Sequence, residues 1–139
     1  MVKMSVVYTG ELRCRATHGP SSAELTTDAP RDNHGKGEAF SPTDTLATAL
    51  ATCMLTVMGI EARKAGYDID GMEAAIEKHM TAAPPRKVAK LVVDVSVAAD
   101  KAAKLDAAAR AKLEQIGETC PVRLSLSEAV EVVTNYRWG

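Results

Sequence analysis

Apolar residues are most concentrated between Leu46 and Ile60, where only threonines, Cys53 and Gly59 interrupt the run. In a soluble chain, a helix that is apolar on nearly every side is buried, so this run predicts a buried central helix. The run is shorter than the roughly 20 apolar residues that cross a bilayer. We therefore expect no membrane-spanning segment and no membrane partner.

Both ends of this helix carry sequence signals. The segment Ser41-Pro42-Thr43-Asp44 offers a serine N-cap, a proline at the first helical position and an acid three residues after the cap. Charged residues return from Glu61 onward, and Gly66 follows them as a stop signal. The sequence therefore predicts a helix over residues 42–65.

The segment before the helix alternates between apolar and polar residues with period two. Its apolar phase consists of Val6, Tyr8, Leu12, Cys14 and Ala16. Because Gly10 interrupts the alternation, residues 4–17 are predicted to form one strand or a bent pair. Residues 22–27 are predicted to pair with it across a turn, and the polar residues 28–40 to form mostly a loop.

The chain after the helix contains two more alternating segments and a second helical pattern. Residues 72–80 and 91–97 alternate and flank Pro84-Pro85, so they are predicted to form a long hairpin. Helical spacing of apolar residues predicts one helix from about Lys101 to Ile116, and residues 130–134 are predicted to form a closing strand. The order β-β-β-α-β-β-α-β defines an α+β fold, in a single domain over residues 1–139.

Composition narrows the classes of function. Apolar residues make up 46% of the chain and charged residues 25%, as in ordinary soluble proteins. The net charge of −1 and the aromatic content of 4% argue against a nucleic-acid partner. Residues 1–5 show no signal-peptide core, and three cysteines do not make a disulfide framework. We expect a cytoplasmic protein with reduced thiols.

The three cysteines differ in their local context. Cys53 lies within the apolar helix, where a thiol is either reactive or simply packed in the core. Cys120 precedes Pro121, which predicts a short helix. A thiol at a helix N-terminus meets free N–H groups that favour the thiolate, and Arg123 adds positive charge one turn later. The alternative for Cys120 is a cap residue packed under the last strand, and Cys14 on its predicted strand is expected only to fill core space.

The sequence offers no pattern for a metal or an organic cofactor. It contains no Cys-x-x-Cys pair, and His18, His34 and His79 lack the spacing of zinc ligands. The missing Cys-x-x-Cys pair also excludes a thioredoxin-type dithiol. We expect a protein without a bound cofactor.

Several motifs together resemble the OsmC/Ohr family. The segment SPTDTLATALATC, from Ser41 to Cys53, is similar to the central-helix signature Pro-x-[Glu/Asp]-x-Leu…Ala-x-Cys of that family. Cys120-Pro121-Val122, followed by a short helix and the closing strand, is similar to its second cysteine segment. The Tyr8-Thr9-Gly10 opening and the glycine-containing loop from Asp28 fit the same pattern. The resemblance covers nearly the whole chain and favours the OsmC-like branch over the Ohr branch.

The resemblance implies an OsmC-like fold and an intertwined homodimer in which the two cysteines approach each other. It implies a thiol-dependent peroxidase that reduces organic hydroperoxides in oxidative or osmotic stress defence. Cys53 would be the peroxidatic cysteine and Cys120 the resolving one, and a lipoyl- or thioredoxin-type dithiol would reduce their disulfide. The alternative is an OsmC-like binding or stress protein with little or no turnover. A third possibility is a structural dimer with inert thiols.

The sequence departs from the Ohr branch where that branch holds its thiolate. An arginine in the first hairpin and a glutamate after the helix proline form an ion pair there, and His18 and Thr43 fall near those positions here. Asp44 is an acid that OsmC-like members often carry, although it is also explained as a capping-box acid. His18 is either a substitute cation or a turn residue. We name Asp44, His18 and Arg123 as supporting residues of the site.

Overall fold

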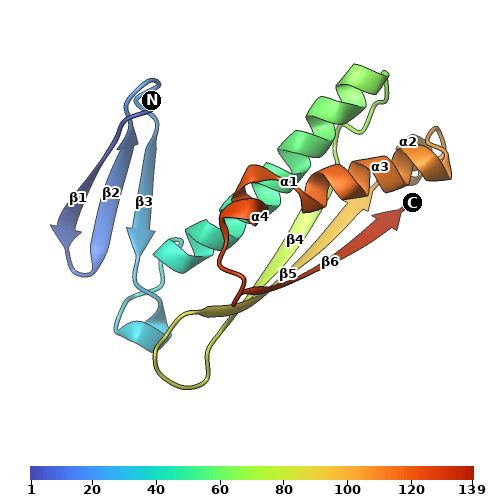
Figure 1. The fold of residues 1–139 in the computed structure, drawn as a ribbon. Coiled ribbons are helices and arrows are strands. Elements are labelled where there is room, and N and C mark those ends of the chain that lie inside the picture. The colour runs from blue at the N-terminus through green and yellow to red at the C-terminus, as the bar shows by residue number, and fades with distance from the viewer. The chain divides into compact units, whose positions relative to one another are not determined.

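The computed structural model describes residues 1–139 and divides them into two compact parts, Met1–Leu46 and Ala47–Gly139. The α+β prediction is confirmed. The elements (Figure 1) are, in chain order, β1 (Met4–Gly10), β2 (Arg13–His18), β3 (Glu24–Asp28), the 3-10 turn η1 (Arg31–Asn33), α1 (Pro42–Ala65), β4 (Glu73–Met80), β5 (Val88–Val97), α2 (Ala99–Ala102), α3 (Ala107–Glu118), α4 (Pro121–Ser125) and β6 (Glu131–Trp138).

The first part contains an antiparallel sheet in the order β1-β2-β3. Residues 4–17 form the bent pair, because β1 and β2 are joined through Glu11 and Leu12, both of which have positive φ. Strand β3 pairs with β2 as predicted, with Cys14 opposite Thr27. The segment between β3 and α1 is a loop apart from η1.

The first part has no hydrophobic core of its own. Its only buried residues, Asp28 and Ser41, are polar. On one face of β1, Met4, Val6 and Tyr8 leave 68%, 65% and 63% of their surface exposed. Because an independent domain has its own core, a single domain over residues 1–139 stays our prediction.

Helix α1 begins and ends where the sequence signals predict. The Ser41 amide donates to a carboxylate oxygen of Asp44 (2.8 Å), and the Asp44 amide donates to the Ser41 hydroxyl (3.1 Å). This reciprocal pair satisfies two amides at the start of the helix. At the other end Gly66 has a φ of 78°, and the Tyr67 amide donates to the Ala62 carbonyl (2.8 Å). The chain therefore leaves the helix through a left-handed C-cap turn.

The prediction that α1 is buried on nearly every side is wrong for the single chain. Leu50, Met54 and Met58 have no exposed surface, whereas Ile60 is 50% exposed and Thr56 is also exposed. The helix therefore packs along one face only. By length and composition α1 would suffice to cross a membrane. The core helix of a soluble protein passes the same test, so this is only weak evidence for a membrane-spanning helix.

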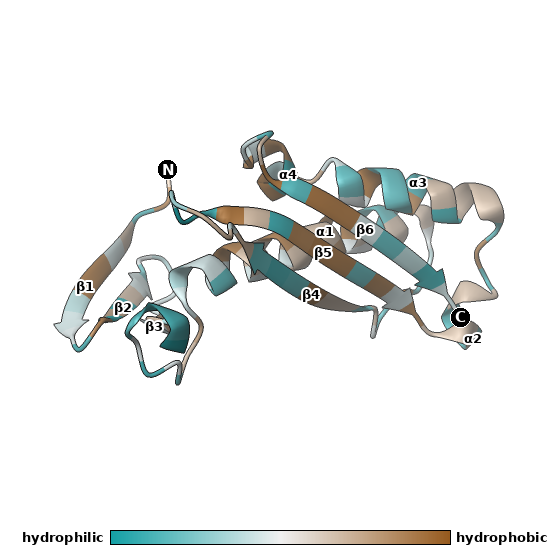
Figure 2. Cartoon of the chain, turned by 90° about the horizontal axis from the view of Figure 1, so that it is seen from below, coloured by the Kyte–Doolittle hydropathy of each residue, from teal (hydrophilic) through white to brown (hydrophobic).

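The second part contains the sheet β4-β5-β6, with helices over one of its faces (Figure 1). Strands β4 and β5 form the predicted antiparallel hairpin. Strand β6 runs parallel to β5, because the chain crosses between them through α2, α3 and α4. The middle strand β5 is the most hydrophobic of the three in Figure 2, and its residues Leu91, Val93 and Val95 belong to the buried core.

The predicted helix over residues 101–116 is in fact two helices, α2 and α3. The carboxylate of Asp106 interrupts the helix, because it accepts the amide of Ala109 (2.8 Å) and caps the start of α3. The guanidinium of Arg110 donates to the carbonyls of Ala102 (2.7 Å) and Leu105 (3.1 Å). These contacts satisfy carbonyl groups that the break releases.

Replacing Leu50 by alanine is expected to lower the free energy of unfolding by about 2–5 kcal/mol, because it leaves a cavity against the second sheet. Thr52→Ala, on the face of α1 that the chain's own core leaves uncovered, is expected to lower it by less than Leu50→Ala does, because no cavity forms in that core. Urea unfolding at one fixed protein concentration measures both. Equal losses would contradict the one-sided packing of α1.

Candidate active site

Cys53 lies in the middle of α1, at the border between its buried and exposed faces. Its side chain is half-buried and packs against the core that contains Leu50 and Met54. The apolar character of α1 thus gives this thiol a shielded position that is still reachable from outside. A reactive cysteine needs partial access of this kind.

Cys120 occupies the N-cap of α4, as the sequence predicts. Pro121 begins the helix, and the amide of Arg123 donates to the Cys120 sulfur (3.4 Å). The amide of Cys120 in turn donates to the carbonyl of Gly117 (3.2 Å) in the last turn of α3. Only 1% of the surface of Cys120 is exposed, so the residue is held from both sides in the core.

The fold brings Cys53 and Cys120 together. Their side chains are close enough to interact, and the Cys53 thiol contributes to raising the pKa of Cys120. Both cysteines are free thiols. Two adjoining thiols can be joined as a disulfide by a two-electron oxidation.

Burial raises the pKa of the Cys120 thiol above its usual value. The amide of Arg123 opposes this rise, and the neighbouring Cys53 adds to it, but burial has the largest effect. The amides at the helix N-terminus thus favour the thiolate at Cys120, as expected, but burial outweighs them. At neutral pH this residue is a protonated thiol.

The structure places the three predicted supporting residues in different settings. Arg123 contacts Cys120 through its main chain, while its side-chain Nε is buried without a hydrogen-bond partner. Asp44 caps the start of α1. The Nδ1 atom of His18 lies 2.6 Å from the hydroxyl of Ser21, in the turn after β2. Asp44 and His18 thus each have a structural explanation in their own segment, and a role for any of the three in chemistry stays a prediction.

Cys14 differs from the other two cysteines in position. It lies half-buried on β2, opposite Tyr8 of β1 and Thr27 of β3. In the single chain Cys14 does not fill a hydrophobic core, since the first part has no such core. Because Cys14 is, like Cys53, a half-buried free thiol, its replacement can serve as a control for the replacement of Cys53.

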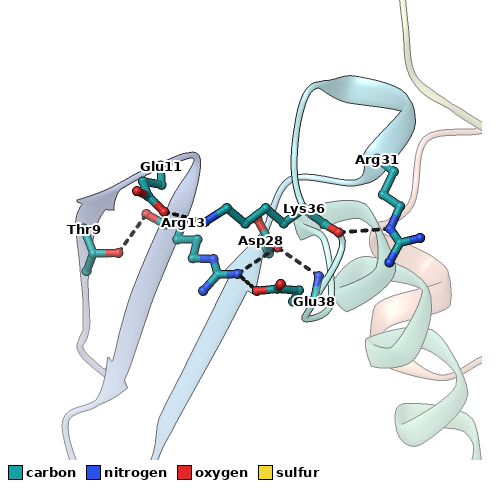
Figure 3. Close-up of polar contacts among 7 residues, drawn as sticks. All are labelled: Thr9, Glu11, Arg13, Asp28, Arg31, Lys36 and Glu38. Atoms are coloured by element: carbon teal, nitrogen blue, oxygen red, sulfur yellow. Dashed lines mark hydrogen bonds and ion pairs between the residues drawn. The ribbon is translucent and has the colours of Figure 1, made fainter.

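A cluster of charges that the sequence analysis did not identify organises the first part (Figure 3). The buried carboxylate of Asp28 accepts the amide of Glu38 (2.9 Å) and the guanidinium of Arg13 (3.4 Å). Arg13 also pairs with the carboxylate of Glu38, and Lys36 pairs with Glu11 (2.8 Å). The Glu38 amide, and then the charge of Arg13, lower the pKa of Asp28. Asp28 is therefore ionised at neutral pH.

These contacts tie β2 to the loop that precedes α1. The loop folds back so tightly at Gly35 that an added Cβ atom would lie 1.7 Å from the carbonyl oxygen of Ala29. Only glycine fits such an approach. Arg13, Asp28 and Glu38 follow no regular spacing in the sequence. Their opposite charges were the only signal from which the cluster could have been predicted. Arg13, one of two arginines on β2, is thus paired with two carboxylates of its own part.

In the second part of the chain, the long helix α1 and the N-cap of the short helix α4 each carry one cysteine. No group of three or more His, Cys, Asp or Glu side chains is placed to hold a metal ion. The chain belongs to the OsmC-like protein family, which residues 35–135 match. This match confirms the resemblance found in the sequence. A search of curated proteins found none that matches the chain.

Solved structures share the fold over the whole chain. A protein of Psychrobacter arcticus 273-4, described provisionally as an osmotic stress induced and detoxification response protein, is 41% identical, with a TM-score of 0.90 over 98% of this chain and 96% of that one. The organic hydroperoxide resistance protein OsmC of Legionella pneumophila is 16% identical, with a TM-score of 0.75 over 99% and 96% of the two chains. OhrB of Bacillus subtilis, also an organic hydroperoxide resistance protein, is 16% identical, with a TM-score of 0.66 over 98% and 97%. The two distant relatives share the fold alone.

With Cys14 and Cys53 replaced by serine, we expect Cys120 to ionise only above a pH of about 8.5, the pKa of a free cysteine. Ultraviolet absorbance of the thiolate measures this, with the variant lacking all three cysteines as the blank. In the unfolded chain the same thiol ionises first. The stability that burial of the neutral thiol contributes is therefore present below that pH and is lost as the pH rises through the folded-state pKa. Half-ionisation at or below the pKa of a free cysteine, about 8.5, would contradict the dominant effect of burial.

Proposed function

We propose that this protein is a cytoplasmic thiol-dependent peroxidase that reduces organic hydroperoxides in oxidative or osmotic stress defence. The observation that carries this proposal is the pairing of Cys53 and Cys120, two free thiols that interact inside an apolar part of the fold. Apolar surroundings favour an organic hydroperoxide over hydrogen peroxide. The OsmC and OhrB relatives named for organic hydroperoxide resistance support the same reaction.

In the first step, the Cys53 thiolate attacks the terminal oxygen of the hydroperoxide. An S–O bond forms, the O–O bond breaks, and the departing alkoxide takes a proton to become an alcohol. Cys53 is then a sulfenic acid, the first reversible stage of cysteine oxidation. In the second step, the sulfur of Cys120 attacks the sulfur of Cys53. The S–S bond forms as the S–O bond breaks, and the hydroxide takes the Cys120 proton to become water.

The two environments fit this division of roles. Cys53 is half-buried and reachable, whereas Cys120 is 1% exposed and protonated, with its pKa raised by burial. A neutral buried thiol does not compete for the substrate, and it carries the proton that the leaving hydroxide needs. An external dithiol of the lipoyl or thioredoxin type then reduces the disulfide. No bound metal or organic cofactor enters the cycle.

The alternative function, a binding or stress protein of the same fold with little turnover, is favoured by two observations. His18 falls near the position where the Ohr branch carries its arginine, and Arg13, on the same strand, is paired with Asp28 and Glu38. Thr43 follows the helix proline at the position where the Ohr branch carries a glutamate. Peroxide-dependent consumption of dithiothreitol or dihydrolipoamide distinguishes the two functions, since a binding protein consumes neither.

We also propose that the protein is an intertwined homodimer. Its first part has no hydrophobic core, and one face of β1 exposes Met4, Val6 and Tyr8. On α1, Ile60 is 50% exposed beside exposed threonines. Apolar surface of this extent is covered in stable proteins by another surface, and a second copy of the chain provides the same complementary faces.

Cys53→Ser is expected to abolish peroxide reduction, because a hydroxyl cannot replace the thiolate as the nucleophile. Cys120→Ser is expected to react once and then accumulate over-oxidised Cys53, since no resolving thiol remains. Serine also keeps an N-cap for α4, so the helix is preserved. Turnover with cumene hydroperoxide and dihydrolipoamide, together with the mass of the oxidised protein, measures both effects.

Cys14→Ser is the control for this experiment and is expected to keep turnover within about twofold of the wild type. Wild-type turnover in Cys53→Ser would refute the assignment of the nucleophile. Absence of turnover in the wild type, with intact protein and reductant, would support the binding function instead.

The dimer predicts a solution mass of about twice the 14.7 kDa of one chain. We expect an interface of more than about 2,000 Å², as in obligate dimers. Light scattering at micromolar concentration measures the mass. A monomer under these conditions would rule out the dimer.

A further inference from the structure

The last strand of the second part reaches across to the end of α3. The hydroxyl of Tyr136 on β6 donates to the carboxylate of Glu118 (3.2 Å) and to the carbonyl of Glu114 (3.3 Å). Two residues further along, the indole of Trp138 donates to the carboxylate of Glu114 (2.6 Å). Two aromatic residues of β6 thus hold the final turn of α3 through polar contacts.

These contacts lie beside Gly117, where α3 packs against Met58 of α1. An added Cβ atom at Gly117 would lie 2.9 Å from the hydroxyl oxygen of Tyr136 and 3.1 Å from the sulfur of Met58. Gly117 also accepts the amide of Cys120 (3.2 Å). The Tyr136 hydroxyl therefore lies beside the turn that carries the Cys120 thiol.

The hydroxyl of Tyr136 stays a hydrogen-bond donor over the whole physiological range. Burial, and then the neighbouring Glu118 carboxylate, raise its pKa well above the usual value. A hydrogen bond from a neutral hydroxyl to a carboxylate is stronger than one between two neutral groups. The contact is thus suited to hold the end of α3 in one place.

We propose that Tyr136 and Glu118 are positioning residues that fix the turn between α3 and α4, and that they thereby hold the Cys120 thiol against Cys53. This inference rests on the proposed function, because it assigns these residues a part in forming the Cys53–Cys120 disulfide. Without the contact, the turn samples more positions and the two sulfurs meet less often. The effective concentration of one thiol toward the other then falls.

The full-length protein in a Cys14→Ser background, equilibrated in glutathione redox buffers, tests the proposal. Both thiols lose their protons and together two electrons to oxidised glutathione, which gives one protein disulfide and two reduced glutathiones. We expect Tyr136→Phe to lower the equilibrium constant for this disulfide about tenfold, which corresponds to about 30 mV in its reduction potential. Glu118→Ala should lower it by less, because the Tyr136 hydroxyl keeps its bond to the Glu114 carbonyl. The double variant should lower it no further than Tyr136→Phe, since that variant already removes the contact with Glu118.

Two further variants separate positioning from general destabilisation. Glu118→Gln keeps an acceptor for the Tyr136 hydroxyl and should lose no more than about threefold, since a neutral hydrogen bond keeps roughly half the strength. Tyr67→Phe removes a hydroxyl from another half-buried tyrosine of the same part and should leave the equilibrium unchanged. If Tyr136→Phe proves unfolded by circular dichroism, Glu118→Ala and Glu118→Gln carry the comparison.

A wild-type equilibrium constant in both Tyr136→Phe and Glu118→Ala would overturn the proposal. So would a wild-type protein that forms no disulfide between Cys53 and Cys120 in oxidising buffer. Because the disulfide equilibrium is measured without peroxide, its result does not depend on whether the protein is a peroxidase. If the wild type shows no peroxide turnover but Tyr136→Phe still lowers the disulfide equilibrium constant, the peroxidase function alone is refuted. If the wild type turns over peroxide but Tyr136→Phe leaves the equilibrium constant unchanged, the positioning role alone is refuted.

Discussion

The close approach of α3 to α1 and β6 at Gly117 governs the second part of the chain. A side chain at Gly117 would require the sulfur of Met58 or the hydroxyl of Tyr136 to shift, because they would lie 3.1 Å and 2.9 Å from its Cβ atom. Protein interiors are packed as densely as organic crystals, so these close contacts limit where the end of α3 can lie. Cys120 follows three residues later, with its amide bonded to Gly117. The place of this thiol is therefore a consequence of helix packing.

The pKa of the Cys120 thiol is set by two opposing effects of its environment. A helix N-terminus lowers the pKa of a thiol, and burial raises it. Helix α4 has only five residues, so few aligned peptide dipoles act on Cys120. Burial leaves almost none of its surface in contact with water. The pKa therefore rises, and the same residue that looks reactive in the sequence is a protonated thiol in the fold.

The first part of the chain is organised by charge. Asp28 is fully buried, and its partners come from β2 and from the loop before α1. Burying the Asp28 carboxylate costs hydration, which its contacts with the Glu38 amide and the Arg13 guanidinium offset. The hairpin and the loop are thus held in register, while the apolar residues of β1 stay exposed in the single chain.

Local sequence determined the elements whose signals act over a few residues. The capping box at Ser41 and Asp44 and the stop at Gly66 place both ends of α1, and period-two alternation identifies the strands, because each signal involves neighbours in the chain. The paired context of Cys53 and Cys120 also pointed to the family. Tertiary structure alone decided the parallel pairing of β6 with β5, the one-sided burial of α1 and the break capped by Asp106. It also decided the charge cluster around Asp28 and the raised pKa of Cys120, since these depend on which distant groups share space and on how much water they exclude.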